Sequence, residues 1–372
     1  MAEDTPARPT AKGTSARALL LGALWWCGVA VADGPSFGAV LASRFDALDV
    51  PGIAFAVVAD GAIVERGGLG LADAASGEPV DATTPFRVAS LTKPLSAALL
   101  LNAVHAGDAD LDTPLRIASS RYRHLCRAMK LRFALARPPW LDGIDCGSER
   151  ITVRHVLTHT ATTPPGCAFS YNGFLFGLLS DEIGDVTVGG GDDNFRRAVR
   201  ERVIEPLGLR RSAAGVTDPD GRRVVADLAS AHVREGEHWV VRPDLEDPLN
   251  AGAGFVASAG DMARIDIAYR DRLLAHPSLW RRMTATTVLS DGSPSPYGMG
   301  WFVQTIDGRE IVWHHGHQPG AYSALWIRDV ERGRTLVLLA NGDGLAAGKE
   351  LHLGDLARSS VANAFLAWSA GE

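Results

Sequence analysis

Residues 90–104 read Ser-Leu-Thr-Lys-Pro-Leu-Ser-Ala-Ala-Leu-Leu-Leu-Asn-Ala-Val. Beyond its first turn it is apolar on nearly every side, which predicts a helix buried within a core. Pro94 suits the start of such a helix, because the N–H groups of the first turn have no acceptor within the helix. We therefore expect a helix that begins close to Ser90 and carries Lys93 in its first turn.

Ser90 and Lys93 form a Ser-x-x-Lys pair that has the chemistry of an activated nucleophile. A serine hydroxyl is a weak nucleophile at neutral pH and needs a partner that takes its proton. Residues three apart share a helix face, so Lys93 can approach the Ser90 hydroxyl. Burial or a neighbouring cation would lower the pKa of Lys93 from about 10.4 and leave a neutral amine to act as a base.

The chain before this helix predicts a short helix at 36–48 and two strands at 53–60 and 63–68. The chain from about 110 to 290 carries short helical patterns without repeats, among them residues 151–160, where Thr152 can serve as N-cap. This middle part therefore predicts a helical region.

Near the C-terminus, four β-rich runs follow one another, separated by Asp-Gly, Pro-Gly and Arg-Gly turns. They are WFVQTI, REIVWHH, AYSALWI and RTLVLLAN. Such a rhythm is typical of an antiparallel meander. A last helical segment is expected from about 349 to 370.

Strands at both ends of the chain and helices between them predict an α/β (α+β) fold. We expect an antiparallel sheet flanked by helices plus an inserted all-α lobe, within a single domain at 33–372. The sheet lobe would take residues from about 36–85 and 295–372, and the helical lobe about 90–290. A cleft is expected between the two lobes.

The first 32 residues are typical of a secretory signal peptide. Arg8, Lys12 and Arg17 precede an apolar stretch at 18–32 that ends in Ala-Val-Ala. The stretch is shorter than the about 20 residues that a membrane-spanning helix needs. We therefore expect cleavage after Ala32, a periplasmic or secreted protein, and no stable membrane span after cleavage.

The composition is that of an ordinary globular protein, with 372 residues, 46% of them hydrophobic and 22% charged. The net charge of -6 argues against a general nucleic-acid binder. Export would permit disulfides, and Cys126, Cys146 and Cys167 allow one bridge in any of three pairings. Their spacing does not suggest a zinc site.

Residues 86–93, Phe-Arg-Val-Ala-Ser-Leu-Thr-Lys, resemble the nucleophile segment of the serine β-lactamase and penicillin-binding-protein superfamily, nearest its class C and esterase-like branch. Further family-like stretches follow in the expected order: ITVRHVLTHT at 151–160, Pro165-Gly166 with residues 169–171, EPLGL at 205–209, GAGFVASAGDMAR at 252–264, YGMGW at 297–301 and His-His-Gly at 314–316. The resemblance covers roughly residues 36–342. It implies a β-lactamase/transpeptidase-like fold.

The resemblance also implies roles for single residues. Ser90 would be the acylated serine and Lys93 its activating partner. Tyr171 matches the tyrosine of the family's Y-x-N motif, which passes the proton between nucleophile and leaving group. No metal or organic cofactor is implied.

The resemblance also implies which residues bind the oxyanion and the substrate. His314-His315-Gly316 matches the K-T-G motif of true β-lactamases, written H-x-G in many esterase-like relatives. The oxyanion hole would combine the backbone N–H groups of Ser90 and His317. His314, Gly316 and Asn172 complete the expected oxyanion and substrate-binding residues.

Two departures from the family pattern narrow the range of expected functions. Gly173 stands where Y-x-N has its asparagine, while Asn172 lies one residue early, so that residues 170–172 could also be read as Ser-x-Asn. Tyr171 is preferred because Pro-Gly-x-x-Phe-x-Tyr keeps the register. His314 replaces a permanent cation that would hold a β-lactam carboxylate, which makes ester or amide hydrolysis the better expectation.

We therefore expect a secreted serine hydrolase that acts through an acyl-enzyme on a small-molecule or peptide substrate, of carboxylesterase or D-peptidase type. The alternative is a catalytically weak or inactive penicillin-binding-like protein that binds cell-wall peptides. His155 and His159 are four apart, as zinc ligands are, but Val156 stands where a metalloprotease needs its glutamate. The basic segment 116–137 predicts either a rim for anionic substrates or membranes, or a solvated face. The sequence leaves the oligomeric state open.

Overall fold

The computed structural model describes residues 35–115, 127–128, 130–132, 150–162, 164–242 and 249–371. These residues belong to one compact unit, Asp33–Glu372. The expected signal peptide, Cys126, Cys146 and almost all of the basic segment 116–137 lie outside the described residues. Cys167 is exposed and has a free thiol. No helix in the described ranges is both long and apolar enough to cross a membrane.

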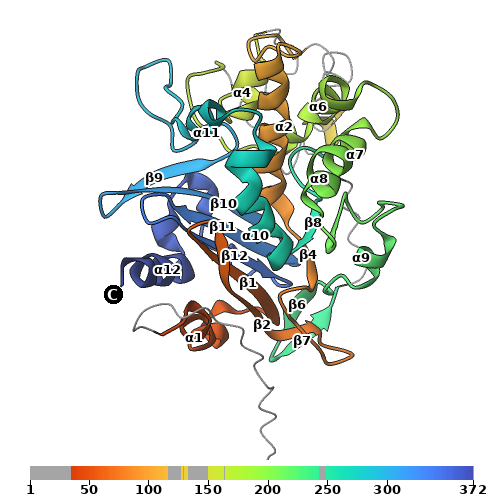
Figure 1. The fold of residues 1–372 in the computed structure, drawn as a ribbon, viewed down its shortest axis with the longest axis vertical. Coiled ribbons are helices and arrows are strands. Elements are labelled where there is room, and N and C mark those ends of the chain that lie inside the picture. Colours follow the sequence, from red (N-terminus) through yellow and green to blue (C-terminus); the bar gives the residue numbers. More distant parts are fainter. Residues whose placement is uncertain are drawn as a thin grey trace, which may run out of the picture. The chain divides into compact units, whose positions relative to one another are not determined.

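A seven-stranded antiparallel sheet forms the centre of the unit, in the order β3-β2-β1-β12-β11-β10-β9 (Figure 1). Its strands are β1 (Gly52–Ala59), β2 (Ala62–Asp73), β3 (Glu78–Pro79), β9 (Phe302–Ile306), β10 (Arg309–Gln318), β11 (Tyr322–Asp329) and β12 (Arg334–Ala340). The C-terminal meander is confirmed. β1 joins it by pairing with β12, Ile53 opposite Ala340, so the sheet combines both ends of the chain as expected.

Both faces of the sheet are covered, which explains why β12 is apolar without alternation. Successive side chains of a strand point to opposite faces. Val337 and Leu339 therefore pack into the core that contains α2 (Thr92–Ala106), while Leu336 and Leu338 pack into a second core on the other face.

Each face has its own helices. On the face of the second core lie α1 (Phe37–Ala42) and α12 (Ser360–Ala370), whose Phe37 and Phe365 rings meet edge to face at 5.6 Å. On the other face lies α10 (Ala259–Ala268), tied to β11 by a hydrogen bond from Trp326 Nε1 to Asp266 Oδ1 (2.7 Å). Residues 349–358 form two 3₁₀ turns, η6 (Leu351–Leu353) and η7 (Leu356–Arg358), so the last α-helix begins later than expected.

Helix α2 follows a 3₁₀ turn, η2 (Ala89–Leu91), and is buried on all sides along its central turns, as its sequence predicts. Its C-cap is Gly107 in the left-handed region (φ 88°), a conformation that glycine adopts without steric cost. In Figure 1 this helix runs upward from the sheet and stands among the helices of the middle region. The first turn of α2, with Ser90 just before it, therefore lies where the sheet meets the helical region.

The middle region is mostly helical. Its helices are α4 (Val153–Leu157), α5 (Gly173–Gly177), α6 (Leu179–Val188), α7 (Asn194–Val199), η4 (Arg200–Ile204), α8 (Glu205–Leu207), α9 (Arg222–Ala226), η5 (Tyr269–Leu273) and α11 (Pro277–Thr284). It also contains strands, contrary to the expected all-α lobe: β5 (Ser212–Ala213) and β8 (Val256–Ser258) form a small sheet with β4 (Pro85–Arg87), and β6 (His232–Glu235) pairs with β7 (His238–Val241). Strands of two to four residues are too short to show a period of two in the sequence.

Candidate active site

The segment before α2 holds Ser90 in a strained turn. Ala89 has φ 47°, in the left-handed region that costs a residue with a side chain about 1–3 kcal/mol. Hydrogen bonds on both sides maintain this conformation: the Val88 N–H donates to the Phe255 carbonyl (3.0 Å), and the Thr92 hydroxyl donates to the Ala89 carbonyl (2.8 Å). Ser90 is thereby left partly exposed at the head of a buried helix.

Lys93 lies directly beneath Ser90. Its Nζ donates to Ser90 Oγ at 2.8 Å and to the Gly252 carbonyl at 2.9 Å, and the side chain is only 1% exposed. The Nζ also lies 5.0 Å from the centre of the Tyr171 ring and 5.4 Å from that of Phe176. The serine, the lysine and the tyrosine that the sequence singled out are therefore brought together.

Tyr171 comes from the loop before α5, and its hydroxyl is buried. Burial raises the pKa of the Tyr171 phenol far above its ordinary value, and the nearby Ser90 hydroxyl offsets part of this rise. Among the described residues the hydroxyl has no partner at hydrogen-bond geometry. The phenol is therefore protonated at neutral pH, next to the Ser90 hydroxyl.

Asn172 and Gly173 take positions that the motif alone did not reveal. Asn172 is buried, and its Oδ1 accepts the Leu175 N–H (2.9 Å), so that it caps α5. A Cβ built on Gly173 would lie 3.6 Å from Lys93 Nζ, so the usual place of the motif's amide does face the lysine. In this chain the Gly252 carbonyl accepts a hydrogen bond from that Nζ instead.

Strand β10 forms the wall next to Ser90, and Gly316 permits its close approach. A Cβ at Gly316 would lie 2.4 Å from the Val88 carbonyl oxygen and 3.3 Å from the Ala89 Cβ. Only glycine therefore lets β10 pack against η2 at this point. His317 follows directly and pairs with Ser323 of β11.

We expect the substitution Gly316→Ala to lower kcat/KM by about 10²-fold, because the His317 N–H, which is expected to hold the oxyanion, would move away from Ser90. Overpacking should also lower the free energy of unfolding by about 1–3 kcal/mol. Steady-state kinetics and thermal unfolding measure both effects. Gly190→Ala, at an exposed glycine, serves as control. Unchanged kinetics of Gly316→Ala would show that the activity does not depend on the close approach of β10 to Ser90.

His314 is fully buried, with both ring nitrogens in hydrogen bonds. Its Nδ1 lies 2.7 Å from the His315 carbonyl, which can only accept, so Nδ1 carries the proton; Nε2 then accepts from the Tyr297 hydroxyl at 2.9 Å. Burial, helped by His315 and Lys93, lowers the pKa of His314 well below its ordinary value. His314 is thus neutral, and its side chain links β10 to Tyr297, which precedes β9 in the chain.

His315 and His317 differ in exposure. His315 is 5% exposed, and burial together with Lys93 lowers its pKa to about 3. Its ring nitrogens form no hydrogen bond among the described residues. His317 is half-buried, with Nε2 3.6 Å from Asp343 Oδ2. The motif thus supplies one histidine tied to Tyr297, one that is buried and neutral, and one near the surface.

The buried histidines predict acid lability. The pKa values of His159, His314 and His315 are lowered in the folded protein. Above about pH 6.5 these groups are neutral in both states; below it the unfolded chain binds protons that the folded one does not, so stability falls as the pH falls. Each histidine contributes about 1.4 kcal/mol per pH unit. Urea unfolding at pH 7.5, 6.5 and 6.0 measures the slope, above the range where most carboxylates titrate, and a flat profile would contradict this prediction.

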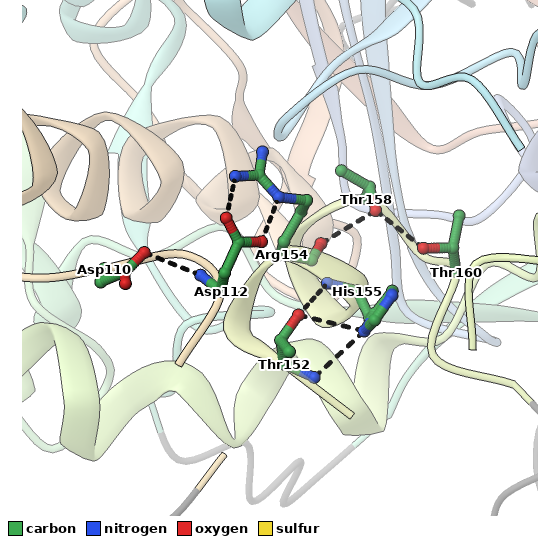
Figure 2. A network of polar contacts seen from close by, with 7 residues as sticks. All are labelled: Asp110, Asp112, Thr152, Arg154, His155, Thr158 and Thr160. Carbon is green, nitrogen blue, oxygen red and sulfur yellow. Dashed lines mark hydrogen bonds and ion pairs between the residues drawn. The ribbon is translucent and has the colours of Figure 1, made fainter. Parts of the chain in front are cut away.

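In the part of the chain that the structure describes, His155 and His159 form no zinc site with other side chains. No cluster of three or more His, Cys, Asp or Glu in the described ranges has the geometry to hold a metal ion. His155 instead completes the cap of α4, where its Nδ1 accepts the Thr152 N–H (3.1 Å), and Arg154 binds Asp112 through two hydrogen bonds of 2.7 and 2.8 Å (Figure 2).

A serine and a lysine at the head of a buried helix, beside a seven-stranded antiparallel sheet, define a protein of the β-lactamase/transpeptidase fold. The family model described as Beta-lactamase matches residues 39–357, and the chain belongs to this family.

Among curated proteins, the chain is similar to a D-aminopeptidase of Gluconobacter oxydans (strain 621H), with 30% identity over 303 residues that cover 77% of this chain and 55% of that protein. A D-aminopeptidase of Brucella ovis is 26% identical over 326 residues, covering 82% and 58%. The chain thus spans little more than half the length of these relatives.

Solved structures show the same fold. A penicillin-binding protein homologue from Pyrococcus abyssi, described as octameric, has a TM-score of 0.69 at 19% identity and covers 90% of this chain and 77% of its own. A D-amino acid amidase from Ochrobactrum anthropi SV3 has a TM-score of 0.62 at 18% identity and covers 90% and 99%.

Proposed function

We propose that this protein is a serine hydrolase that forms an acyl-enzyme on Ser90 and cleaves amides or peptides of D-amino acids. The observation that carries the proposal is the contact of 2.8 Å between Lys93 Nζ and Ser90 Oγ, in a place where the lysine is 1% exposed. The fold and the D-aminopeptidase relatives support the choice of substrate.

The geometry supports a reaction in two halves. Ser90 Oγ attacks the carbonyl carbon while its proton passes to Lys93 Nζ, and the backbone N–H groups of Ser90 and His317 hold the oxyanion. The C–N bond breaks as the Tyr171 phenol gives a proton to the leaving amine and regains one from Lys93. Water then attacks the ester, and the acid leaves as Ser90 recovers its proton.

The histidines around Ser90 favour substrates without a carboxylate next to the scissile bond. His314 is neutral and hydrogen-bonded to Tyr297 and to the His315 carbonyl, and His315 is neutral as well. Neither supplies the permanent cation that a β-lactam or a C-terminal dipeptide would need. An amide, an ester or the N-terminal bond of a peptide needs no such partner.

The experiment is a substrate panel with matched enantiomers. We would measure turnover of D- and L-alanine p-nitroanilide, D-alanine amide, D-Ala-D-Ala, nitrocefin and p-nitrophenyl acetate, and follow the intact mass of the protein. Preferential turnover of the D-anilide and D-amide is expected. Turnover of the ester alone would make the protein an esterase, and a stable adduct without turnover would make it a penicillin-binding-like protein.

Gly173 is the feature that favours this last, binding-only function, because the motif's amide is missing there. The Gly252 carbonyl at 2.9 Å from Lys93 Nζ supplies a different partner for the lysine, which favours a working enzyme.

We also propose that the protein is exported, with residues 1–32 acting as the signal peptide. The basic start, the apolar stretch and the Ala-Val-Ala sequence support this proposal. N-terminal sequencing of the protein from the medium or the periplasm should begin at Asp33, in the single domain that we propose for 33–372.

A further inference from the structure

His159 contacts the tyrosine loop from two directions. Its backbone carbonyl accepts the Ser170 N–H (2.8 Å), and its ring Nδ1 accepts the Asn172 N–H (3.1 Å). These two N–H groups belong to the residues on either side of Tyr171. One residue therefore fixes the backbone before and after the phenol.

The ring of His159 also packs on the tyrosine itself. The centres of the His159 and Tyr171 rings are 4.4 Å apart, and His159 is 2% exposed. Because Nδ1 accepts a hydrogen bond, the ring proton is on Nε2 and the ring is neutral. Burial lowers the pKa of His159 well below its ordinary value, which keeps Nδ1 available as an acceptor.

The backbone of His159 has an unfavourable conformation. In this conformation both its carbonyl and its ring Nδ1 accept hydrogen bonds from the tyrosine loop. Its φ is 55°, in the left-handed region that only a few per cent of residues with a side chain adopt. The segment around it is firmly held: the Thr158 hydroxyl donates to the Arg154 carbonyl (2.9 Å) and lies 3.0 Å from the Thr160 hydroxyl (Figure 2). Such strain persists where neighbouring contacts fix the backbone, and it clusters at functional sites.

We infer that His159 is a positioning residue that holds the Tyr171 phenol against Ser90 by accepting the N–H groups on both sides of it. This inference rests on the proposed function, because the phenol must protonate the leaving group. The side-chain acceptor is the part that can be removed by substitution.

Two variants separate the acceptor from the ring. His159→Phe keeps a ring of similar size but has no acceptor, whereas His159→Asn keeps an acceptor for the Asn172 N–H and tolerates the left-handed backbone. His159→Phe is expected to lower kcat for the D-anilide or D-amide by about 10²-fold, the cost of a misplaced catalytic group. His159→Asn should stay within about fivefold of the wild type, since general acid catalysis is retained.

Substrates with different leaving groups distinguish a displaced Tyr171 phenol from a general loss of active-site structure. p-Nitrophenolate leaves without protonation, so the turnover of a p-nitrophenyl ester should change by less than about threefold in His159→Phe. The control is His232→Phe, at a buried histidine whose Nε2 accepts the Ala74 N–H (3.0 Å) at the far end of β2. That variant should lose stability without changing the ratio of amide to ester turnover.

Hydrogen exchange tests the inference even if the wild type hydrolyses no amide. The amides of residues 170–173 should exchange faster in His159→Phe and as in the wild type in His159→Asn. Unchanged protection in His159→Phe, or equal losses of amide and ester turnover, would overturn the positioning role. An inactive wild type with the expected exchange pattern would refute the proposed function alone.

Discussion

Replacing Ser90 with alanine is expected to lower kcat/KM for every hydrolysed substrate by about 10⁴-fold or more, because the acyl-enzyme cannot form. The fold should persist, since Ser90 is partly exposed and its side chain contributes little burial. Steady-state kinetics and the mass increment after treatment with a fluorophosphonate measure the loss. The increment should appear in the wild type and be absent from Ser90→Ala.

A matched control lies on the same helix. The Ser96 hydroxyl is buried and donates to the Ala251 carbonyl at 2.8 Å, so Ser96→Ala removes a hydroxyl of equal size away from the reacting atoms. This control should lose about 1 kcal/mol of stability and keep its activity. Retained turnover or labelling in Ser90→Ala would show that another residue is the nucleophile.

The substitution Lys93→Arg is expected to lower kcat by about 10³-fold, within the range that general bases contribute. Arginine keeps the positive charge but cannot give up its proton, so it cannot take one from Ser90. If Lys93 acted only as a charge, Lys93→Arg would retain most of the activity, and the base role would be wrong. Lys349→Arg is the control, because Lys349 also donates to a backbone carbonyl, that of Gly344.

The parts of the fold that the sequence predicted are those with long patterns. Helix α2 is apolar over four turns, and the meander has a turn signal between each pair of strands, so both were recognised. The two residues of β5 and the three of β8 are held by pairing with segments distant in the chain, Ser212 opposite Ala257, which no local pattern reveals.

The residues of the candidate site also differ in whether a sequence pattern marks them. Ser90, Lys93 and Tyr171, which the structure brings together, could be predicted because their side chains are part of motifs. Gly252 contributes a carbonyl, and every residue has one, so its contact with Lys93 has no signature in the sequence. No sequence pattern indicates the contacts of His159 with the tyrosine loop, because its two acceptors meet their donors only once residues 170–172 are in place.

The pairing of β1 with β12 has a consequence for how the molecule forms. Contacts between the two ends of a long chain make folding slow, because the entropy of closing the loop is lost before the contacts are gained. During synthesis, Ala340 leaves the ribosome only after the whole helical region that separates it from Ile53. The sheet beside Ser90 is therefore completed only after the helical region between β1 and β12 has been made.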